Sequence, residues 1–307
     1  MKQTIFNKWI RLFRLPFITA SSVPFLIGTA YAFYQYQVLN FSRFVLGFLA
    51  LAALHLAANV LNDYYDYKSG NDAANKNWSP FNGGSRLIQE GLILPKHVLT
   101  TGLICLGIGL VAGFLLLSLV DHYFVLILGG LGILCGIGYT MPPFKWGYRG
   151  IGEIMIGLAF GPLPVIGACF IQTQTVDFGS LFIGLPVGLL IMVVVLVNEI
   201  PDVQADRMVG KKTWVVLFRE KRAVLIATAG ITGAYLLVVI GVIVRFFPVY
   251  TLSVFLTFPL FVLASIQLRN YLKGSPYSFQ ANRMIIQLHS LFGLLFALSL
   301  FLSDLFR

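Results

Sequence analysis

Long apolar stretches recur along nearly the whole chain, and they constrain its fold more than any other feature. A helix needs about 20 residues to cross a hydrocarbon core of roughly 30 Å. The stretches are continuously apolar rather than alternating, which favours helices over a barrel. Hydrophobic residues make up 58% of the 307 residues and charged residues only 11%. This composition excludes a protein whose surface faces water.

We therefore predict an all-α fold, a polytopic membrane bundle of nine transmembrane helices. No long polar linker divides the chain, so a single membrane domain over residues 1–307 is expected. The expected spans are 16–36, 44–62, 97–119, 122–140, 151–171, 178–200, 223–245, 248–268 and 285–303.

Basic residues indicate which span ends face the cytoplasm, because cytoplasmic loops hold most Lys and Arg. With the N-terminus inside, only Arg43, Arg245 and Arg307 of the 22 Lys and Arg residues fall on the outer side. We expect a multi-pass protein of the cell membrane, with the N-terminus and the loops after spans 2, 4 and 6 in the cytoplasm and the C-terminus outside. The net charge of +10 follows from this topology, so membrane lipid is an expected partner and nucleic acid is not.

Half of the twelve acidic residues fall in two short segments, 62–72 and 198–206, which directly follow spans 2 and 6. Each segment opens with an asparagine that is followed four residues later by an aspartate. Residues four apart share one face of a helix, so Asn62 with Asp66, and Asn198 with Asp202 and Asp206, are each expected to form an oxygen-rich patch.

Carboxylates that lie so close repel one another unless a cation neutralises them. Ligands that are all oxygen indicate a hard cation, and Mg²⁺ is usually held by one or two carboxylates together with substrate phosphates. The two segments therefore predict a site for a metal-bound diphosphate. The alternative is that both are solvated helix ends of a transporter or a structural membrane protein, which two matched clusters on one side make less favoured.

Polar residues near these segments are candidates for substrate binding. In span 2, one stripe leads from His55 towards Asp66, and polar residues within a span usually face the bundle interior or a water-filled cavity. The loops after spans 2, 4 and 6 add glycines, cations and aromatic rings that can hold phosphate or shield a carbocation. The candidates are His55, Asn59, Asp63, Arg86, Tyr139, Lys145, Arg149 and Lys211.

Each of these candidates also has a structural interpretation. His55 is equally well explained as a packing residue, and the loop residues as topogenic charge with an interfacial aromatic belt. The paired glycines of the segment 83–86 can bring backbone N–H groups to an anion, with Arg86 as a phosphate ligand, which suggests a lid.

These motifs resemble the UbiA-type membrane prenyltransferases, which have an Asn-Asp-x-x-Asp motif after helix 2 and an Asp-x-x-x-Asp motif after helix 6. The run 62–72, with the glycines and Arg86 that follow, looks most like the branch that prenylates 1,4-dihydroxy-2-naphthoate in menaquinone synthesis. Gly70 occupies the position where many 4-hydroxybenzoate enzymes have a third aspartate. Asp72 comes two residues later, which favours the naphthoate branch.

The resemblance implies a Mg²⁺-dependent transfer of a polyprenyl chain from its diphosphate to an aromatic acceptor such as 1,4-dihydroxy-2-naphthoate. It implies catalytic roles for Asp66, Asp202, Arg86 and Lys145. The implied metal ligands are Asn62, Asp66, Asp72, Asn198, Asp202 and Asp206.

Two alternatives stay open at this point. One is an enzyme of the same type with another acceptor, such as 4-hydroxybenzoate, homogentisate, a haem precursor or an archaeal glycerol lipid. The other is a cation-coupled transporter, which is less favoured because the acidic residues gather at a span boundary rather than at the bilayer midplane.

Overall fold

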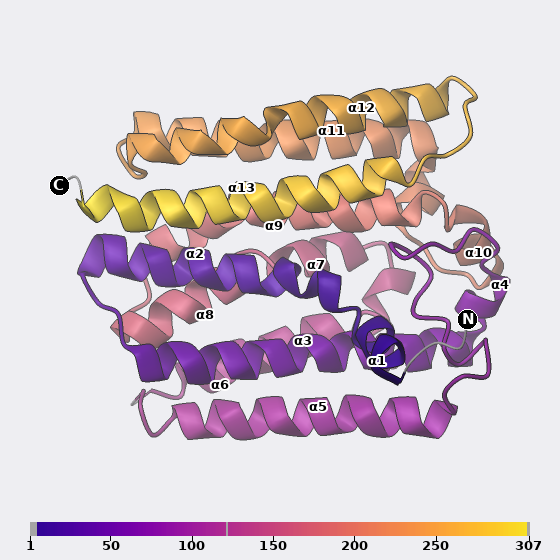
Figure 1. Ribbon diagram of the computed structural model, residues 1–307, viewed down its shortest axis with the longest axis horizontal. Coiled ribbons are helices and arrows are strands. Elements are labelled where there is room, and N and C mark those ends of the chain that lie inside the picture. The colour runs from indigo at the N-terminus through magenta and orange to yellow at the C-terminus, as the bar shows by residue number, and fades with distance from the viewer. Residues whose placement is uncertain (1–4, 121, 306–307) are drawn as a thin grey trace.

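The computed structural model describes residues 5–120 and 122–305, and throughout these ranges its regular elements are helices. The prediction of an all-α membrane bundle is confirmed (Figure 1). In chain order the elements are α1 (Ile5–Phe13), η1 (Leu15–Ile18), α2 (Thr19–Tyr36), α3 (Phe41–Ser69), α4 (Asn71–Ala74), α5 (Pro95–Leu116), α6 (Phe124–Ile137), η2 (Trp146–Tyr148), α7 (Gly152–Ala159), α8 (Pro162–Thr173), α9 (Phe178–Glu199), α10 (Val203–Met208), α11 (Trp214–Ile243), η3 (Val249–Thr257), α12 (Phe258–Leu272) and α13 (Gln280–Leu305).

The number of helices long enough to span differs from the prediction at one place. Eight helices of the described chain are long and apolar enough to cross a membrane. The expected span 122–140 is represented by α6, which has 14 residues and is shorter than the roughly 20 that a hydrocarbon core needs. The expected span 151–171 is a broken helix, α7 followed by α8.

Local sequence explains where the long helices begin and end. The side chain of Asn40 accepts a hydrogen bond from the backbone N–H of Arg43 at 3.0 Å and so caps the start of α3. Gly70 ends α3 with φ 78°, a conformation that glycine adopts without strain. Pro201 follows the end of α9, where the chain turns before α10 begins.

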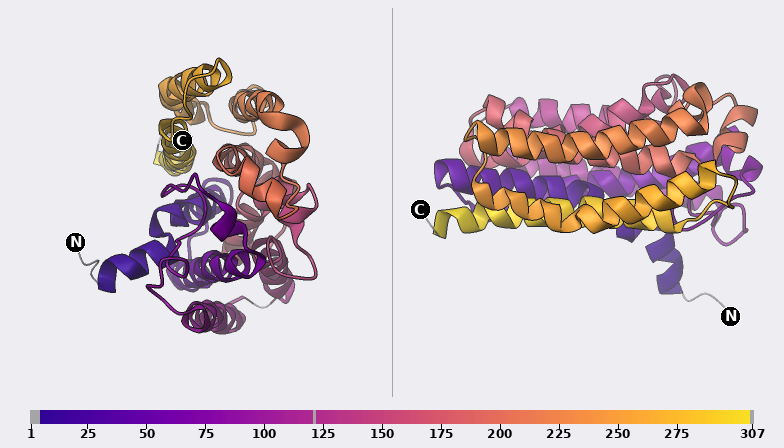
Figure 2. Two further views of the ribbon diagram at one scale, coloured as in Figure 1. Left: turned by 90° about the vertical axis from the view of Figure 1, so that its right-hand side faces the viewer. Right: turned by 90° about the horizontal axis from the view of Figure 1, so that it is seen from above.

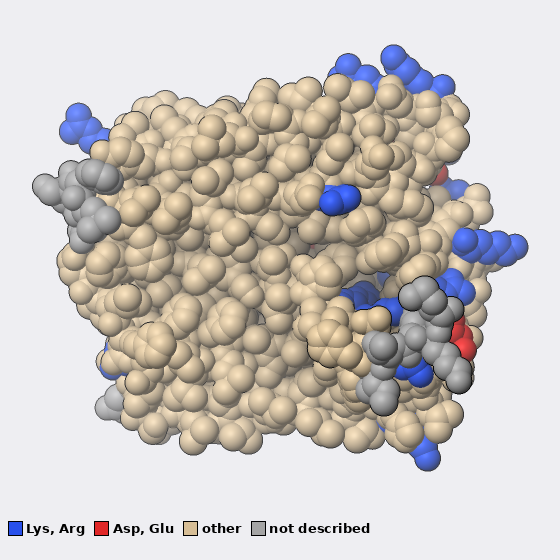
Figure 3. Space-filling view, viewed as in Figure 1, with Lys and Arg blue, Asp and Glu red and all other residues tan. Residues whose placement is uncertain are grey.

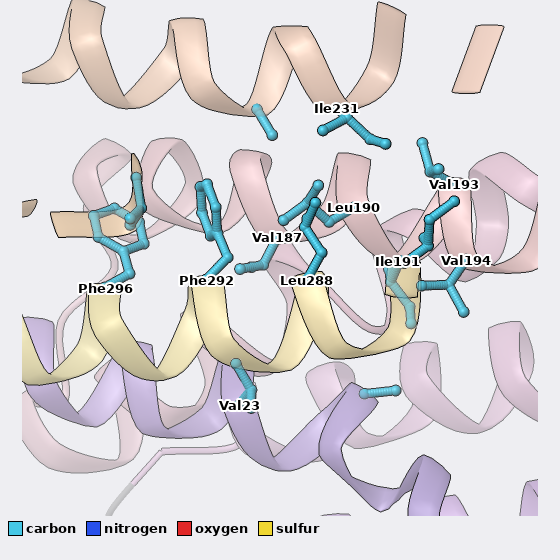
Figure 4. Packing of buried hydrophobic residues seen from close by; sticks show 14 of the residues in the cluster. Val23, Val187, Leu190, Ile191, Val193, Val194, Ile231, Leu288, Phe292 and Phe296 are labelled. Atoms are coloured by element: carbon cyan, nitrogen blue, oxygen red, sulfur yellow. The ribbon is translucent and has the colours of Figure 1, made fainter. Parts of the chain in front are cut away.

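The largest core cluster joins α2, α9, α11 and α13. Phe292 and Phe296 of α13 are fully buried in the same cluster as Val187 and Leu190 of α9 (Figure 4). The break between α7 and α8 also serves packing, because a Cβ atom built on Gly161 would lie 2.3 Å from the Cα atom of Gly188 in α9. Only glycine allows this close approach of two backbones.

One end of the bundle carries the two acidic segments. The C-terminal ends of α3 and α9, together with α4 and α10, lie at the right-hand end of Figure 1. Most of the basic and acidic side chains visible in the space-filling view gather at this same end, while the long middle of the molecule is almost uncharged (Figure 3). The amphipathic helix α1 projects sideways from the bundle near this end (Figure 2).

Candidate active site

Asparagines from the loop after α3 hold the second acidic segment. The side-chain amide of Asn71 donates to Asp206 Oδ1 at 3.0 Å, and the amide of Asn75 donates to Asp202 Oδ1 at 2.7 Å. Asn82 donates to the same oxygen of Asp202. These bonds place α4 beside α10 (Figure 1), so segments more than 120 residues apart in the chain form one site.

The first acidic segment lies on the last turns of α3, and its first aspartate is fully engaged. Asp63 forms an ion pair with Arg14, and its two oxygens accept from the backbone N–H of Ser85 at 3.3 and 3.1 Å. The neighbouring Asn62 accepts from Arg14 at 3.4 Å and donates to the hydroxyl of Thr140 at 3.3 Å. Asp63 and Asn62 therefore fix the loop and the N-terminal segment against α3.

Two aspartates of the site have oxygens that no group satisfies. Within the described residues, Oδ1 of Asp66 and Oδ1 of Asp72 are buried without a hydrogen-bond donor. The other oxygen of Asp72 accepts from the amide of Gln89 at 3.0 Å. Burial, with the negative charges of Asp66 and Asp63, raises the pKa of the Asp72 carboxyl to about 8. A charged form of this carboxyl needs a cation nearby.

The second segment has a similar electrostatic balance around a buried lysine. Burial and the charge of Asp206 raise the pKa of Asp202 to about 7, although hydrogen bonds from Asn82 and Asn75 oppose the shift. Lys211 lies with its Nζ 3.7 Å from Asp206 Oδ1 and 5.3 Å from the ring centre of Tyr139. Burial alone would lower the pKa of Lys211, but Asp206 keeps it well above its ordinary value, so the lysine stays charged.

No three carboxylate, histidine or cysteine side chains converge into a metal cage anywhere in residues 5–120 and 122–305. The charges of Asp66 on α3, Asp72 on α4 and Asp206 on α10 lie close enough to interact, and asparagine amides donate to Asp202 and Asp206. The protein alone thus supplies an incomplete set of ligands. This arrangement suits a cation that takes part of its coordination from a bound phosphate.

The predicted cations of the loops lie around the site with protein partners of their own. Arg86 donates to the backbone carbonyl of Asn75 at 2.7 Å and so ties the glycine-rich segment to the loop that holds Asp202. Lys145 lies 5.0 Å from the ring centre of Tyr148. Arg149 is exposed and donates to the carbonyl of Pro143 at 2.6 Å.

Four other predicted residues have contacts outside the aspartate cluster. The hydroxyl of Tyr139 donates to Glu199 at 3.0 Å, and its ring lies near Lys211. Asn198 accepts from Asn282 of α13 at 2.8 Å, and Asn59 donates to the carbonyl of Phe13 at 3.2 Å. His55 is buried further along α3, where its ring lies 5.2 Å from that of Phe160. The spacing along α3 predicted one polar stripe that leads from His55 and Asn59 to Asp66. In the structure, His55 contacts Phe160 and Asn59 contacts Phe13, so neither shares the partners of the aspartates.

Several residues of the site were not identified from the sequence. Arg14 precedes the first span and was interpreted only as topogenic charge, yet it is the ion-pair partner of Asp63. The sequence alone does not identify the amides of Asn71, Asn75 and Asn82, because an uncharged side chain gives no sign of the carboxylate it will meet in the fold. The signal available was the concentration of asparagine between residues 71 and 82, in a loop longer than a simple turn needs.

Comparison with known proteins gives this geometry a family. The model of the UbiA prenyltransferase family matches residues 21–302. The chain is 30% identical to the 1,4-dihydroxy-2-naphthoate octaprenyltransferase of Bacillus subtilis over 292 residues, which is 93% of this chain and 89% of that protein. It is 32% identical to the Escherichia coli protein of the same name over 223 residues, 70% of each chain.

Solved structures share the fold at lower identity. A UbiA homologue from Aeropyrum pernix superposes with a TM-score of 0.68 at 16% identity, covering 93% of this chain and 96% of the other. A UbiA homologue from Archaeoglobus fulgidus, bound to GPP and Mg²⁺, superposes with a TM-score of 0.64 at 16% identity, covering 96% and 99%. With the family model matching nearly the whole length and the aspartates gathered at one end of the bundle, the chain belongs to the UbiA prenyltransferase family.

Proposed function

We propose that this protein transfers a polyprenyl chain from its diphosphate to 1,4-dihydroxy-2-naphthoate, a step of menaquinone biosynthesis, with Mg²⁺ as cofactor. One observation carries the proposal. Asp66 and Asp72 have buried oxygens without donors among the described residues, the charge of Lys211 acts on both carboxyls, and Asp66 interacts electrostatically with Asp206. The names of the Bacillus subtilis and Escherichia coli relatives support the acceptor.

The residues present fit a magnesium ion. The buried oxygens of Asp66 and Asp72 lack donors, so a bound cation would satisfy both, and all the available ligands are oxygen. Asp66, Asp72, Asp202 and Asp206 would hold the metal together with the diphosphate. The archaeal homologue bound to GPP and Mg²⁺ supports this assignment. The amide oxygens of Asn62 and Asn198 accept hydrogen bonds from Arg14 and Asn282. Each side chain would therefore have to rotate before its oxygen could bind the metal.

The bound metal would neutralise the charge that develops on the diphosphate as the allylic C–O bond breaks. The chain's own cations add to this effect. Lys211 is buried and positively charged beside Asp206, and Arg14 lies against Asn62 and Asp63, so both can stabilise a departing anion in a site of low polarity. Arg86 holds the loop that orients Asp202 and thereby keeps the carboxylates in position.

The acceptor ring then attacks the allylic carbon. In the naphthoate branch the prenyl group replaces the acceptor's carboxylate, which leaves as CO₂. The rings of Tyr139 and Tyr148 lie close to the two lysines of this end and can shield a carbocation through cation–π attraction. We assign this end of the bundle to the cytoplasm, because most of the basic side chains visible in Figure 3 gather there.

The test is an assay of the purified protein in lipid vesicles with Mg²⁺, one allylic diphosphate and a panel of aromatic acceptors. We expect mass spectrometry to identify a prenylated naphthalene-diol, with release of one CO₂ per transfer. EDTA should stop the reaction and excess Mg²⁺ should restore it. Transfer to 4-hydroxybenzoate without loss of CO₂ would replace the acceptor, and an undiminished rate in EDTA would contradict the metal site.

A further inference from the structure

A pocket of about 320 Å³ lies between the N-terminal segment and the loop that follows α3. One wall comes from α1, from η1 and from Arg14 between them, and the other comes from loop residues between Trp78 and Ser85. The volume is in the lower part of the range for small-molecule sites. It therefore suits a ligand of one or two rings rather than a long chain.

Apolar and aromatic residues make up half of the pocket wall. They are Ile10, Pro16, Phe17, Trp78, Pro80 and Phe81. The guanidinium carbon of Arg11 lies 5.1 Å from the ring centre of Trp78, so a planar cation already lies over one of these rings. Aromatic walls favour a ligand that is itself a flat ring, because rings stack or meet edge to face.

Two arginines supply the charge of the pocket, and each has a donor without an acceptor. The two terminal nitrogens of Arg11 donate to the carboxylate of Glu90. Nη2 of Arg14 donates to Asp63 and to Asn62. The Nε atoms of both arginines are buried without a hydrogen-bond partner within the described residues. The edge of each guanidinium that carries Nε is thus left for an oxygen of a ligand.

A carboxylate suits these two edges. A guanidinium binds a carboxylate through two parallel hydrogen bonds, and a buried donor that lacks an acceptor is costly. The wall and the arginines together therefore select a flat aromatic ring that carries a carboxylate. An isoprenoid chain brings no charge to the arginines, and a diphosphate brings no ring to the aromatic wall.

The loop that forms one wall of this pocket also contacts the aspartates. Asn82 lines the pocket and donates to Asp202. Gly84 lines it too, and a Cβ atom built there would lie 2.9 Å from Asp72 Oδ2 and 3.1 Å from Arg14 Nη2. The pocket and the acidic site are therefore neighbours that share one stretch of chain.

We propose that this pocket binds the aromatic acceptor, with its carboxylate at the Nε edges of Arg11 and Arg14 and its rings against Trp78 and Phe81. The inference rests on the proposed prenyl transfer and adds to it the place of the acceptor, 1,4-dihydroxy-2-naphthoate. Because the same loop holds Asp202, it brings the acceptor and the metal-bound diphosphate to adjoining sites.

The test measures binding of 1-hydroxy-2-naphthoate, and of 1-naphthol, which lacks the carboxylate. The first compound is chosen because it has no 4-hydroxyl and is not oxidised to a quinone during a titration. The protein is in lipid nanodiscs with EDTA and without prenyl diphosphate, so neither metal nor transfer enters the measurement. Isothermal titration calorimetry gives both dissociation constants, with protein-free nanodiscs as the blank. We expect wild type to prefer the naphthoate by about tenfold or more.

The decisive variant is Arg11→Gln, which removes the charge and keeps a polar side chain. Its affinity for the naphthoate should fall by about tenfold or more, because a charge-assisted hydrogen bond is lost, while its affinity for naphthol should stay as in wild type. Lys8→Gln removes a charge from the same helix outside the pocket wall and should bind both compounds as wild type does. Equal binding of the naphthoate by wild type and Arg11→Gln would overturn the proposal.

Glu90→Gln separates a binding role of Arg11 from a structural one. It removes the same ion pair as Arg11→Gln but leaves the guanidinium in the pocket. The naphthoate should bind this variant at least as tightly as wild type, because Arg11 is no longer neutralised by its partner. A loss as large as that of Arg11→Gln would show that the ion pair only holds α1 against the loop.

Phe81→Ala tests the aromatic wall, and it should weaken both compounds by the same factor, about fivefold, since both have the rings. A loss confined to one compound would contradict the assignment of this wall.

Inorganic diphosphate serves as a competitor and should leave naphthoate binding unchanged in EDTA. Displacement would assign the two arginines to the leaving group instead. A wild type that binds the naphthoate in this way but transfers no prenyl group to 1,4-dihydroxy-2-naphthoate would contradict the proposed function and leave the pocket standing. A wild type that transfers the prenyl group but binds naphthoate and naphthol alike would overturn the pocket and leave the function standing.

Discussion

The two acidic segments have the same spacing in the sequence but are supported in different ways. In the first, Asn62 and Asp66 lie on unbroken helix, since α3 continues to Ser69, and only Asp72 lies beyond Gly70, in α4. The second crosses a turn: Asn198 belongs to α9, Asp202 precedes α10, and Asp206 lies within α10. The repeat of Asn and Asp four residues apart therefore produces a common helix face only in the first segment.

The partners of the aspartates differ accordingly. In the first segment, the cation Arg14 and a backbone N–H hold Asp63, and Asp66 is left with an unsatisfied buried oxygen. In the second, neutral amides of the loop donate to Asp202 and Asp206, and Lys211 adds a positive charge 3.7 Å from Asp206. The first segment thus offers a rigid, open ligand, whereas the second depends on the loop being in place. Loops of this kind are the part of a site that can order when substrate binds.

The strongest test of this difference is Asp66→Asn, which removes one charge without changing shape. We expect kcat/KM for prenyl transfer to fall by about 100- to 1000-fold, because a neutral amide would hold the Mg²⁺ that stabilises the leaving diphosphate more weakly than a carboxylate does. Its melting temperature in EDTA should not fall, since a buried charge is replaced by a neutral amide.

The control for this variant is Asp177→Asn at the opposite end of the bundle. Asp177 caps α9 by accepting from the backbone N–H of Ser180 at 2.6 Å, and asparagine caps a helix equally well. Full activity is expected for it. Turnover of Asp66→Asn within a few-fold of wild type would remove Asp66 from the metal site.

The loop's contribution is tested by Asn75→Ala. Loss of the amide that orients Asp202 should raise the Mg²⁺ concentration needed for half-maximal activity by about 10- to 100-fold, as for other partners of metal ligands. Asn77→Ala is the matched control, because Asn77 lies in the same loop but donates to the carbonyl of Pro201 at 3.1 Å rather than to a carboxylate. Equal Mg²⁺ requirements in the two variants would show that the second segment does not depend on this amide.

Much of the fold could be predicted from the sequence, because only helices and closed barrels satisfy all backbone hydrogen bonds within lipid. Continuous apolar stretches required helices. The basic loops showed that the ends of spans 2 and 6, where the aspartates lie, are on the same side of the membrane. The gathering of the two acidic segments was predicted because each directly follows a span. The short α6 was not predicted, since residues 138–140 continue the apolar composition but leave the helix at Gly138.

The details of the site could not be read in the same way. Whether Asn198 faces the aspartates or Asn282 depends on how α13 packs on α9, which no local pattern records. Arg14 was hidden because a cation before the first span has a sufficient topogenic explanation. The roles of Asn71, Asn75 and Asn82 could not be predicted, because each depends on a hydrogen bond to a carboxylate that is distant in the sequence.

The smallest expected effect is the contribution of Asp72 to the pH dependence of the protein's stability. The pKa of this carboxyl is about 8 in the folded protein and 3.8 in an ordinary environment. A folded-state pKa above the unfolded value means that the native protein binds the proton more tightly. This contribution to stability is fully present below about pH 4 and is lost as the pH rises through about 8. In EDTA, the melting temperature of wild type should therefore fall between these values.

Asp72→Asn should remove this part of the pH dependence and raise the melting temperature at pH 8.5 in EDTA by about a few degrees. With Mg²⁺ and a diphosphate present, the order should reverse, because wild type gains stability from a ligand that the variant binds less well. Thermal unfolding followed by intrinsic fluorescence measures both effects in the same detergent. If the variant and wild type melt alike in EDTA at every pH, Asp72 is not a desolvated acid and the first segment carries its unsatisfied charge on Asp66 alone.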